Sequence, residues 1–553
     1  MQRKILFSLL ILVAGALLFA NSKGEAIVSF EPSIISLLPP LTAITLAMVT
    51  KQAHLSLFLG IVIGACFITG GLWSGLTSSL DHYLVNSLAG SESHTAIMMF
   101  TMAFGGLIGV MSANGSLKGV LQAASKYATN NFRGQLLTAL MGLVIFFDDY
   151  SNSLLVGNMM RPFTDKVRVS REKLSYLIDS TAAPVASLAA VSTWSIFQMS
   201  LLDTPYVTYG ITQSTYVTFL QSIPYSFYCI IAIIFLFLTV VMRKEFGPML
   251  HAETRSQTTG EVLSKNAKPM MDKELVATLD ASETSHWSNA AIPIVLVLSI
   301  TIGGLFITGL QDLAQGVEKS FINIISASNP NTALIWGSFF AGFIAIGISV
   351  FRGLLSISDA MDAWINGARS MVMACVILVL AWTIGDICAE IKTAEYIVDL
   401  TKDFLTPALL PPVTFITAAL VSFSTGSSWA TMSILVPVTV PMAIQLMGGD
   451  NNAIVQTPIF ISTFAAVLSG SVFGDHSSPI ADTTVLSSTA SGADHIDHVR
   501  TQLPYALVCA GIALVAGYFL TGIGMNVFIS IFVGIGLSVA ILKIFGKTVP
   551  TNL

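Results

Sequence analysis

The sequence has few charged residues. Asp, Glu, Lys and Arg make up 10% of its 553 residues and hydrophobic residues make up 54%, whereas soluble proteins average roughly 25% charged residues. A mean hydropathy of +0.77 points the same way. This composition excludes a water-soluble enzyme and indicates a membrane protein.

The sequence also lacks the clusters that indicate metal or nucleic-acid binding. Its five cysteines lie in apolar stretches, with no CxxC pair and no group of histidines nearby, so a zinc or redox site is not expected. The net charge is −5 and there is no basic tail, which argues against nucleic acid as a partner. We therefore expect no cofactor and a lipid bilayer around the chain.

Apolar segments are abundant. At about 20 residues for each spanning helix, the chain has room for roughly 11–13 spans. The basic start and the apolar run within residues 1–20 fit an uncleaved first helix better than a cleaved signal peptide. We predict an all-α polytopic protein of the bacterial cytoplasmic (inner) membrane.

One hydrophilic stretch divides the chain. Residues 243–283 contain 13 charged residues and no periodic apolar face, as expected of a flexible cytoplasmic linker. The predicted parts are an N-terminal helix at 1–33, a first repeat at 34–242, the linker at 243–288, a second repeat at 289–524, and a C-terminal helix and tail at 525–553.

The two halves have their polar interruptions in the same order. Residues 103–162 align with residues 379–438, which places FDDYSNS over FSTGSSW, and residues 179–193 align with residues 474–488. The identity is low, but the shared order of interruptions indicates a duplication.

Basic residues change sides between the halves. No Lys or Arg lies between Lys51 and Lys118, whereas the corresponding region of the second half contains Arg352 and Arg369. By the positive-inside rule the two repeats are inverted, and we predict that each has a re-entrant hairpin and a broken transmembrane helix. Inverted repeats of this kind are typical of secondary transporters.

The first polar interruption, FFDDYSNS at residues 146–153, has two adjacent carboxylates at the expected tip of a hairpin. An acid at membrane depth costs at least about 2.5 kcal/mol, which favours a functional role. The alternative is that these acids cap the next helix at the cytoplasmic edge. The candidate binding residues are Asp148, Asp149, Ser151 and Asn152.

The second interruption, DSTAAPVASLAAVST at residues 179–193, is centred on Pro184. Proline cannot donate the hydrogen bond that continues a helix, so we expect a break there. The small residues could equally form a packing kink, whereas the intramembrane Asp179 is the candidate binding residue of this segment.

The third interruption is uncharged and the fourth is acidic. FSTGSSW at residues 423–429 offers hydroxyl and carbonyl oxygens, which suit an alkali cation, although they could merely satisfy the turn of a hairpin. In GDHSSPIADTT, two carboxylates flank a proline and could hold one ion between them. The candidates are Thr425, Ser427 and Ser428 in the third segment, and Asp475, Ser478, Asp482, Thr483 and Thr484 in the fourth, with Asp475 and Asp482 as Na+ ligands.

His476 is a candidate pH sensor because histidine titrates near physiological pH, although a histidine in a polar loop is more often only a hydrogen-bonding residue. Lys and Arg are nearly absent from the apolar segments. A carrier of anions would usually place a fixed cation against its substrate, so the buried negative charge favours a cation as the transported species.

These segments resemble a known family. FFDDYSN, the basic run RPFTDKVRVSREKLSYLIDS and the motif GDHSSPIADTT are similar to segments of the NhaC family of sodium/proton antiporters, over roughly residues 95–520. The resemblance implies exchange of cytoplasmic Na+ for external H+, and it points to Asp475, Asp482, Thr483 and Thr484. His476 and the long linker depart from the family pattern.

Two other functions compete with Na+/H+ exchange. In a Na+- or H+-coupled carrier of organic acids, such as a malate/lactate exchanger, FSTGSSW would bind a carboxylate through hydroxyls and hairpin-tip amides. An intramembrane enzyme is disfavoured, because no basic residue accompanies the acidic motifs and the GxGD signature of aspartyl proteases is missing. A homodimer is compatible with either carrier, and the sequence does not distinguish Na+ from Li+ or K+.

Overall fold

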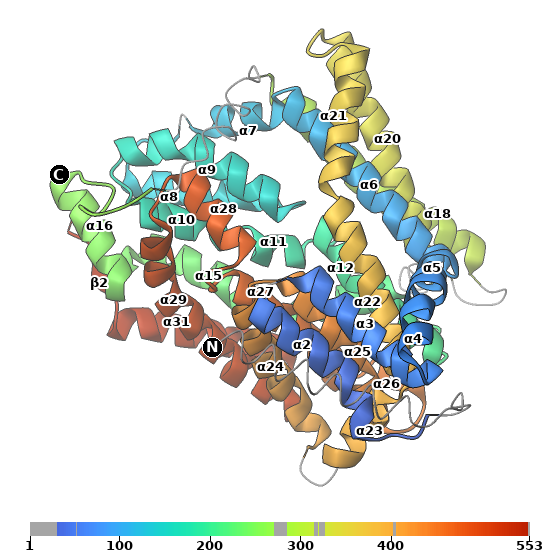
Figure 1. Ribbon diagram of the computed structural model, residues 1–553. Coiled ribbons are helices and arrows are strands. Elements are labelled where there is room, and N and C mark those ends of the chain that lie inside the picture. The colour runs from blue at the N-terminus through green and yellow to red at the C-terminus, as the bar shows by residue number, and fades with distance from the viewer. Residues whose placement is uncertain are drawn as a thin grey trace.

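The computed structural model (Figure 1) describes residues 30–550, except residues 51, 126, 270–284, 314–318, 320–323, 325–326 and 402–404. Nearly all of this described part is helical. Its one strand pairing is antiparallel, between β1 (Lys244–Glu245) and β2 (Lys547–Thr548). The predicted all-α fold is confirmed, whereas the helix predicted in residues 1–20 lies outside the described residues.

The first half, from residue 34 to residue 242, consists of helices of very different lengths. Short 3-10 or π turns occur at Ile34–Leu37, Ser79–Tyr83 and Ile223–Tyr225. The α-helices are α2 (Leu38–Thr50), α3 (Ala53–Thr69), α4 (Leu72–Ser78), α5 (Leu84–Ala89), α6 (Glu92–Ala113), α7 (Ser116–Ser125), α8 (Asn131–Val144), α9 (Asp149–Lys166), α10 (Arg171–Asp179), α11 (Ala183–Leu188), α12 (Thr193–Ser200), α13 (Asp203–Thr208), α14 (Thr215–Ser222) and α15 (Phe227–Met242).

The rest of the chain repeats this mixture of long and interrupted helices. Short 3-10 or π turns occur at Pro407–Leu409 and Ala513–Phe519. The α-helices are α16 (Gly247–Thr259), α18 (Ser288–Asp312), α20 (Pro330–Phe351), α21 (Ile357–Ser370), α22 (Val372–Glu390), α23 (Thr393–Thr401), α24 (Leu410–Thr425), α25 (Ser428–Met447), α26 (Asn451–Ile454), α27 (Pro458–Asp475), α28 (Asp482–Ser491), α29 (His495–Ile512), α30 (Leu520–Gly522) and α31 (Val527–Ile544).

Nine helices of the described part are long and apolar enough to cross a membrane, and two bent helix pairs raise that number to as many as 11. One bent pair joins Arg171–Leu188 to Thr193–Thr208, and the other joins Thr215–Tyr225 to Phe227–Met242. The chain is therefore a multi-pass membrane protein. The higher number meets the lower end of the predicted range of roughly 11–13 spans.

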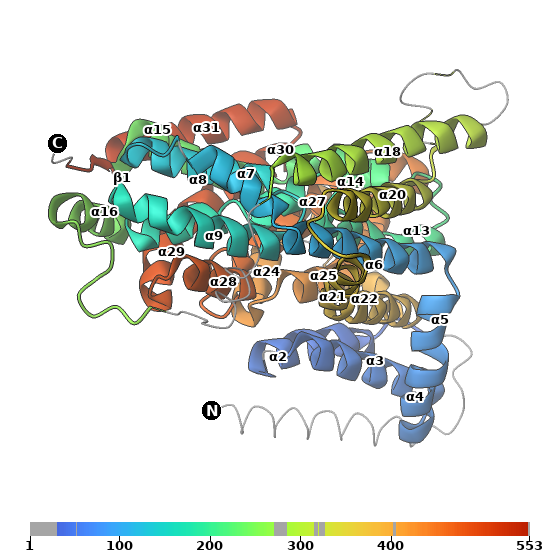
Figure 2. The same ribbon diagram turned by 90° about the horizontal axis from the view of Figure 1, so that it is seen from above.

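The long helices pack in two groups. In Figures 1 and 2, α6, α18, α20 and α21 lie side by side along one flank, and α6 contacts both α20 and α21. In the interior, α25 and α27 are buried along most of their length, whereas α31 is mostly exposed, as expected of a helix that faces lipid. The interior group contains the interrupted helices.

Each half has a helical hairpin followed by a broken helix. In the first half α8 and α9 form the hairpin, and α8, at about 21 Å, is shorter than the roughly 30 Å hydrocarbon core. In the second half α24 and α25 form the hairpin, and both α25 and the segment Pro407–Thr425, which is α24 with the preceding 3-10 turn, are long enough to cross. The order of elements is the same in both halves, while the duplication, the re-entrant path of the hairpins and the inverted relation of the halves stay predictions.

The broken helix of the first half differs in detail from the prediction. The sequence predicts the break at Pro184, but Pro184 lies in the first turn of α11, where its missing N–H leaves no intrahelical bond unmade. The chain instead leaves the helix just before α11, and it bends by 49° between Leu188 and Thr193. The main bend is thus displaced towards the hairpin tip.

The beginning of the predicted flexible linker is folded. It forms β1 and α16, and α16 buries Glu253 against residues of the first half. Glu253 accepts hydrogen bonds from the Ser170 backbone N–H at 2.8 Å and from the Gln135 amide at 3.1 Å. Because this face of α16 is polar, it lacks the periodic apolar residues by which a packed helix is recognised in sequence.

Candidate functional site

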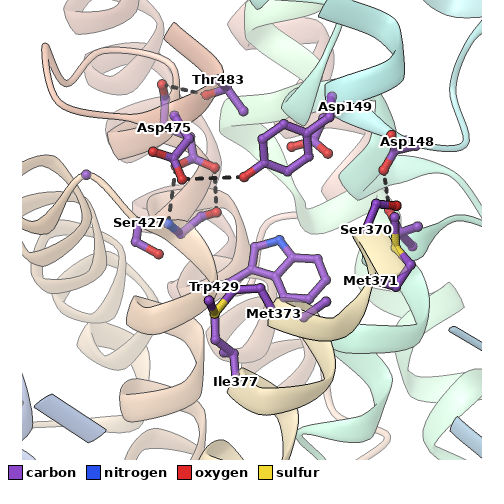
Figure 3. A pocket seen from close by; sticks show the side chains of 16 residues that line it. Asp148, Asp149, Ser370, Met371, Met373, Ile377, Ser427, Trp429, Asp475 and Thr483 are labelled. Atoms are coloured by element: carbon purple, nitrogen blue, oxygen red, sulfur yellow. Dashed lines mark hydrogen bonds between the residues drawn. The ribbon is translucent and has the colours of Figure 1, made fainter. Parts of the chain in front are cut away.

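A cavity of about 200 Å³ lies where the two hairpin tips and the broken helix α27–α28 meet (Figure 3). It combines acids, hydroxyls and apolar side chains. Its lining residues are Asp148, Asp149, Tyr150, Thr193, Ser370, Met371, Met373, Ala374, Ile377, Gly426, Ser427, Ser428, Trp429, Asp475, Asp482 and Thr483.

Four helices begin at this cavity. Asp149, Thr193, Ser428 and Asp482 are the first residues of α9, α12, α25 and α28, respectively, and each lines the cavity. A helix N-terminus presents free N–H groups and a partial positive charge of roughly +0.5. The aspartates therefore occupy positions where the backbone itself stabilises negative charge.

Asp148 and Asp149 lie at the tip of the first hairpin. Asp148 caps α9 by accepting a hydrogen bond from the Ser151 backbone N–H at 2.8 Å, and the Thr193 hydroxyl donates to it at 3.4 Å. Both acids are almost fully buried. The capping role that the sequence offered as an alternative therefore applies to Asp148, and the same residue also lines the cavity.

Asn152 holds the tip of the first hairpin together. Its amide group donates to the carbonyl oxygens of Gly142 at 2.7 Å, Ile145 at 3.0 Å and Thr181 at 2.8 Å. Neither Asn152 nor Ser151 lines the cavity. These two predicted site residues therefore fix the backbone around the acids and do not face the cavity themselves.

Asp475 ends α27 and is bound to the tip of the second hairpin. Its carboxylate accepts hydrogen bonds from the Ser428 hydroxyl at 2.5 Å and from the Ser428 backbone N–H at 3.2 Å. Its peptide oxygen accepts from the hydroxyls of Thr483 at 3.2 Å and Thr484 at 2.6 Å, which lie beyond the break. The two threonines thereby tie the ends of the broken helix together.

Asp482 begins α28 and is the exposed acid of the four. The hydroxyl of Tyr150, a residue that is 44% exposed, donates to it at 3.4 Å. Asp475, by contrast, is 5% exposed. The cavity therefore runs from an open mouth beside Asp482 to a buried end beside Asp475, with both predicted Na+ ligands in its wall.

The remaining residues of the third and fourth motifs shape the turns. Ser427 caps α25 through a hydrogen bond from the Ala430 N–H at 3.3 Å, and it lines the cavity. Thr425 accepts from the Ser427 N–H at 3.3 Å, and Ser478 accepts from the Ile480 N–H at 3.4 Å. Thr425, Ser478 and Thr484 do not line the cavity.

Asp179 lies outside the cavity. Its carboxylate accepts hydrogen bonds from Ser487 at 3.2 Å and from Gln502 at 2.5 Å, and it is fully enclosed by α10, α28 and α29. The structure therefore does not bring Asp179 together with the other four predicted acids. It instead connects the broken helix of the first half to that of the second.

His476 is also buried behind the cavity wall. Its two ring nitrogens lie 2.7 Å from the Ser180 hydroxyl and 2.7 Å from the Tyr228 hydroxyl, and the ring does not reach the cavity. These contacts connect the break in α27–α28 with α10 and α15. A pH-sensing role for His476 stays a hypothesis.

Several lining residues were not singled out from the sequence. Tyr150 and Trp429 lie inside FFDDYSNS and FSTGSSW. Their position beside the candidate residues could have identified them. Thr193 is the last residue of the second interruption and begins α12. The apolar wall contains Met373 and Ile377 of α22 and the preceding Met371, and in sequence this segment looks like any other apolar helix.

The lining of the cavity is acidic. Among the residues that line it there are four aspartates and no Lys, Arg or His. Within the part of the chain that the structure describes, no three acidic, histidine or cysteine side chains form a group that could hold one metal ion. A bound cation would therefore take only one or two carboxylates at once, together with hydroxyl or carbonyl oxygens.

Two relatives are similar over different shares of the chain. An uncharacterized protein of Haemophilus influenzae is 32% identical over 505 residues, which cover 90% of this chain and 92% of that protein. The malate-2H(+)/Na(+)-lactate antiporter of Bacillus subtilis is 29% identical over 194 residues, which cover 33% of this chain and 38% of that protein.

The fold is similar to that of a solved transporter, and the sequence matches a family. The YdaH transporter of Alcanivorax borkumensis superposes with a TM-score of 0.51 over 82% of this chain and 90% of that chain, at 16% identity. At this identity the likeness concerns the fold alone. Residues 185–523, more than half of the chain, match the family of Na+/H+ antiporters. The chain is therefore a transporter that belongs to the Na+/H+ antiporter family.

Proposed function

We propose that the protein exchanges Na+ for H+ across the cytoplasmic membrane, and that the carboxylates of the cavity bind the two ions in turn. One observation carries this proposal: four aspartates from both halves of the chain line one cavity that has no basic side chain in its wall.

The charge balance explains why a cation would be needed. The four helix N-termini, at roughly +0.5 each, are partly cancelled by the ends of α21, α24 and α27 at Ser370, Gly426 and Asp475. With its four aspartates ionised, the cavity would therefore keep most of their negative charge, which opposes its movement through a low-dielectric membrane. Binding of either Na+ or H+ reduces this charge, so the two ions compete and exchange follows without a separate gate.

The proposed Na+ ligands are Asp482 and Asp475 together with nearby oxygens. Hard oxygen ligands suit an alkali cation, and the hydroxyls of Ser427, Ser428 and Thr483 line the same wall. Ser428 already donates two hydrogen bonds to Asp475. Asp482 accepts one, from Tyr150, so its carboxylate has more oxygen lone pairs free for an ion. We expect Asp482 to meet an entering ion first.

The open mouth is proposed to face the cytoplasm. The exposed lining residues Asp482, Tyr150 and Met373 mark the mouth, and Ser370, which also lines the cavity, directly follows Arg369. Basic residues accumulate on the cytoplasmic side. In an alternating-access cycle this conformation would be the inward-open one.

Ion flux in reconstituted vesicles tests the proposal. Purified protein in liposomes containing a pH dye should release or take up protons when Na+ alone is added, with Li+ and K+ as comparisons and no organic solute present. Asp482→Asn should lower this Na+-driven proton flux at least tenfold, because the mouth loses its carboxylate. Asp362→Asn, which removes an exposed acid of α21 outside the cavity, should leave the flux unchanged. Undiminished flux in Asp482→Asn contradicts the assignment.

A carrier of organic acids is the second candidate. The observation in its favour is the set of four helix N-termini, whose free N–H groups could bind a carboxylate when the aspartates are protonated. Flux that requires malate or lactate in addition to Na+ would support this candidate. Flux with Na+ and a pH gradient alone supports the first.

A further inference from the structure

The cavity has two chemically different walls. The hairpin tips and the α27–α28 break supply the aspartates, whereas the start of α25 supplies Trp429, α22 supplies Met373 and Ile377, and Met371 directly precedes α22. Figure 3 shows Met373 and Ile377 on the side of Trp429 that faces away from Asp149 and Asp475, and Met371 beside Ser370. These apolar side chains offer no oxygen ligand to an inorganic cation.

The cavity is also larger than the volume that one bound Na+ would fill. A water molecule occupies about 30 Å³ in the liquid, so a cavity of about 200 Å³ has room for roughly six or seven water-sized groups. That space corresponds to an ammonium group with a chain of several carbon atoms. The acids and the apolar wall are near enough for one small molecule to touch both.

Trp429 is held rigidly for contact with such a molecule. Its ring stacks on Phe197 with the centroids 4.0 Å apart, and the edge of Trp194 approaches it with a centroid separation of 6.1 Å. Phe197 and Trp194 are almost fully buried. A preformed aromatic surface binds an apolar chain or a cation without a large ordering cost.

We propose that this cavity binds an organic ammonium ion with an apolar body, which enters in place of Na+. This proposal rests on the cation site of the proposed function and names a second class of substrate for it. The ammonium group occupies the acidic wall beside Asp482 and Asp475, and the carbon chain lies along Met373, Ile377 and Trp429.

Calorimetric binding of n-alkylammonium ions to the purified protein tests the proposal, with methylammonium to n-pentylammonium as the probes and NaCl as the competitor. Burial of one methylene contributes about 0.8 kcal/mol, so each added carbon should tighten binding about threefold to fourfold. Added Na+ should weaken pentylammonium binding. Binding measurements avoid the leakage of neutral amines through liposomes.

Two variants separate the apolar wall from the acids. Met373→Ala, at a 54% exposed position, should weaken pentylammonium binding at least threefold more than it changes Na+ binding. Val376→Ala, at a position of α22 that is exposed but does not line the cavity, should leave both unchanged.

The outcomes distinguish this inference from the proposed function. Na+ binding without alkylammonium competition, or ammonium affinity that is independent of chain length, overturns the inference and leaves Na+/H+ exchange standing. Chain-length-dependent ammonium binding without Na+ binding supports the inference and contradicts Na+ as the exchanged ion.

Discussion

At the scale of single residues, the local sequence around each acid explains how it is tolerated. Asp148 caps the helix that follows it, and such a pattern is recognisable in sequence, whereas Asp475 ends α27 and accepts the Ser428 N–H of α25 from elsewhere in the chain. Four of the five predicted acids line the cavity, and their role in ion binding stays a prediction. Asp179 was the exception, because its partners Ser487 and Gln502 lie far away in the chain.

A residue outside the membrane spans gives a measurable pH dependence. Burial, together with the nearby Glu245, raises the pKa of Glu253 to about 7 from its ordinary value of 4.5. Between these two values the folded protein keeps a proton that the unfolded chain has lost, so stability falls as the pH rises from about 4.5 to 7. The difference corresponds to about 3 kcal/mol.

Glu253→Gln should remove this pH dependence because an amide has no proton to lose in that range. Thermal unfolding of the purified protein in detergent should give equal melting temperatures for the variant and the wild type at pH 4.5, and a higher one for the variant at pH 8. Glu261→Gln, an exposed position of the same region, serves as the control. The same pH dependence in Glu253→Gln and the wild type would refute this prediction.

At the scale of the elements, the site depends on a hairpin tip that fits into a broken helix. Gly426 ends α24 with a φ of 70°, and a Cβ there would meet the Ile480 peptide oxygen at 2.8 Å. Ile480 lies in the break between α27 and α28. The glycine therefore allows both the left-handed turn and the close approach of two elements that carry the acids.

Gly426→Ala should separate these elements. Gly260→Ala is a matched control, because Gly260 ends α16 with a similar φ of 80° and a Cβ there would have only an Arg168 side-chain atom within 4 Å, at 3.9 Å. Both variants incur roughly 1–2 kcal/mol of backbone strain. Only Gly426→Ala should also lower Na+-driven proton flux at least tenfold, as measured in liposomes. Equal flux in the two variants would show that the close approach is unimportant.

The elements also show where prediction from sequence stops. Hairpins and breaks were visible as polar residues inside apolar segments, which lipid-exposed helices do not tolerate. The position of the bend between Leu188 and Thr193 was not visible in the sequence. It depends on the hydrogen bond from the Thr193 N–H to the Phe147 peptide oxygen, at 3.1 Å. The sequence also did not identify the apolar side chains of α22 that line the cavity. Contacts between distant segments decide which apolar side chains reach it.

At the scale of the whole molecule, two halves contribute complementary parts to one cavity. The first half supplies Asp148 and Asp149, and the second supplies Asp475, Asp482 and the apolar wall of α22. The sequence pointed to the acidic segments as candidate sites through their polar interruptions. It could not predict the distance between the acids, which depends on contacts between elements of the two halves, such as those of α28 with α9 and α10.

The central claim is that one set of carboxylates binds Na+ or H+ in alternation. Titration calorimetry of the purified protein with NaCl, repeated in buffers of different ionisation enthalpy, counts the protons released for each Na+ bound. This account predicts Na+ binding that weakens as the pH falls and releases at least about half a proton for each Na+ near the midpoint of that dependence. Na+ binding that releases no proton at any pH would contradict it.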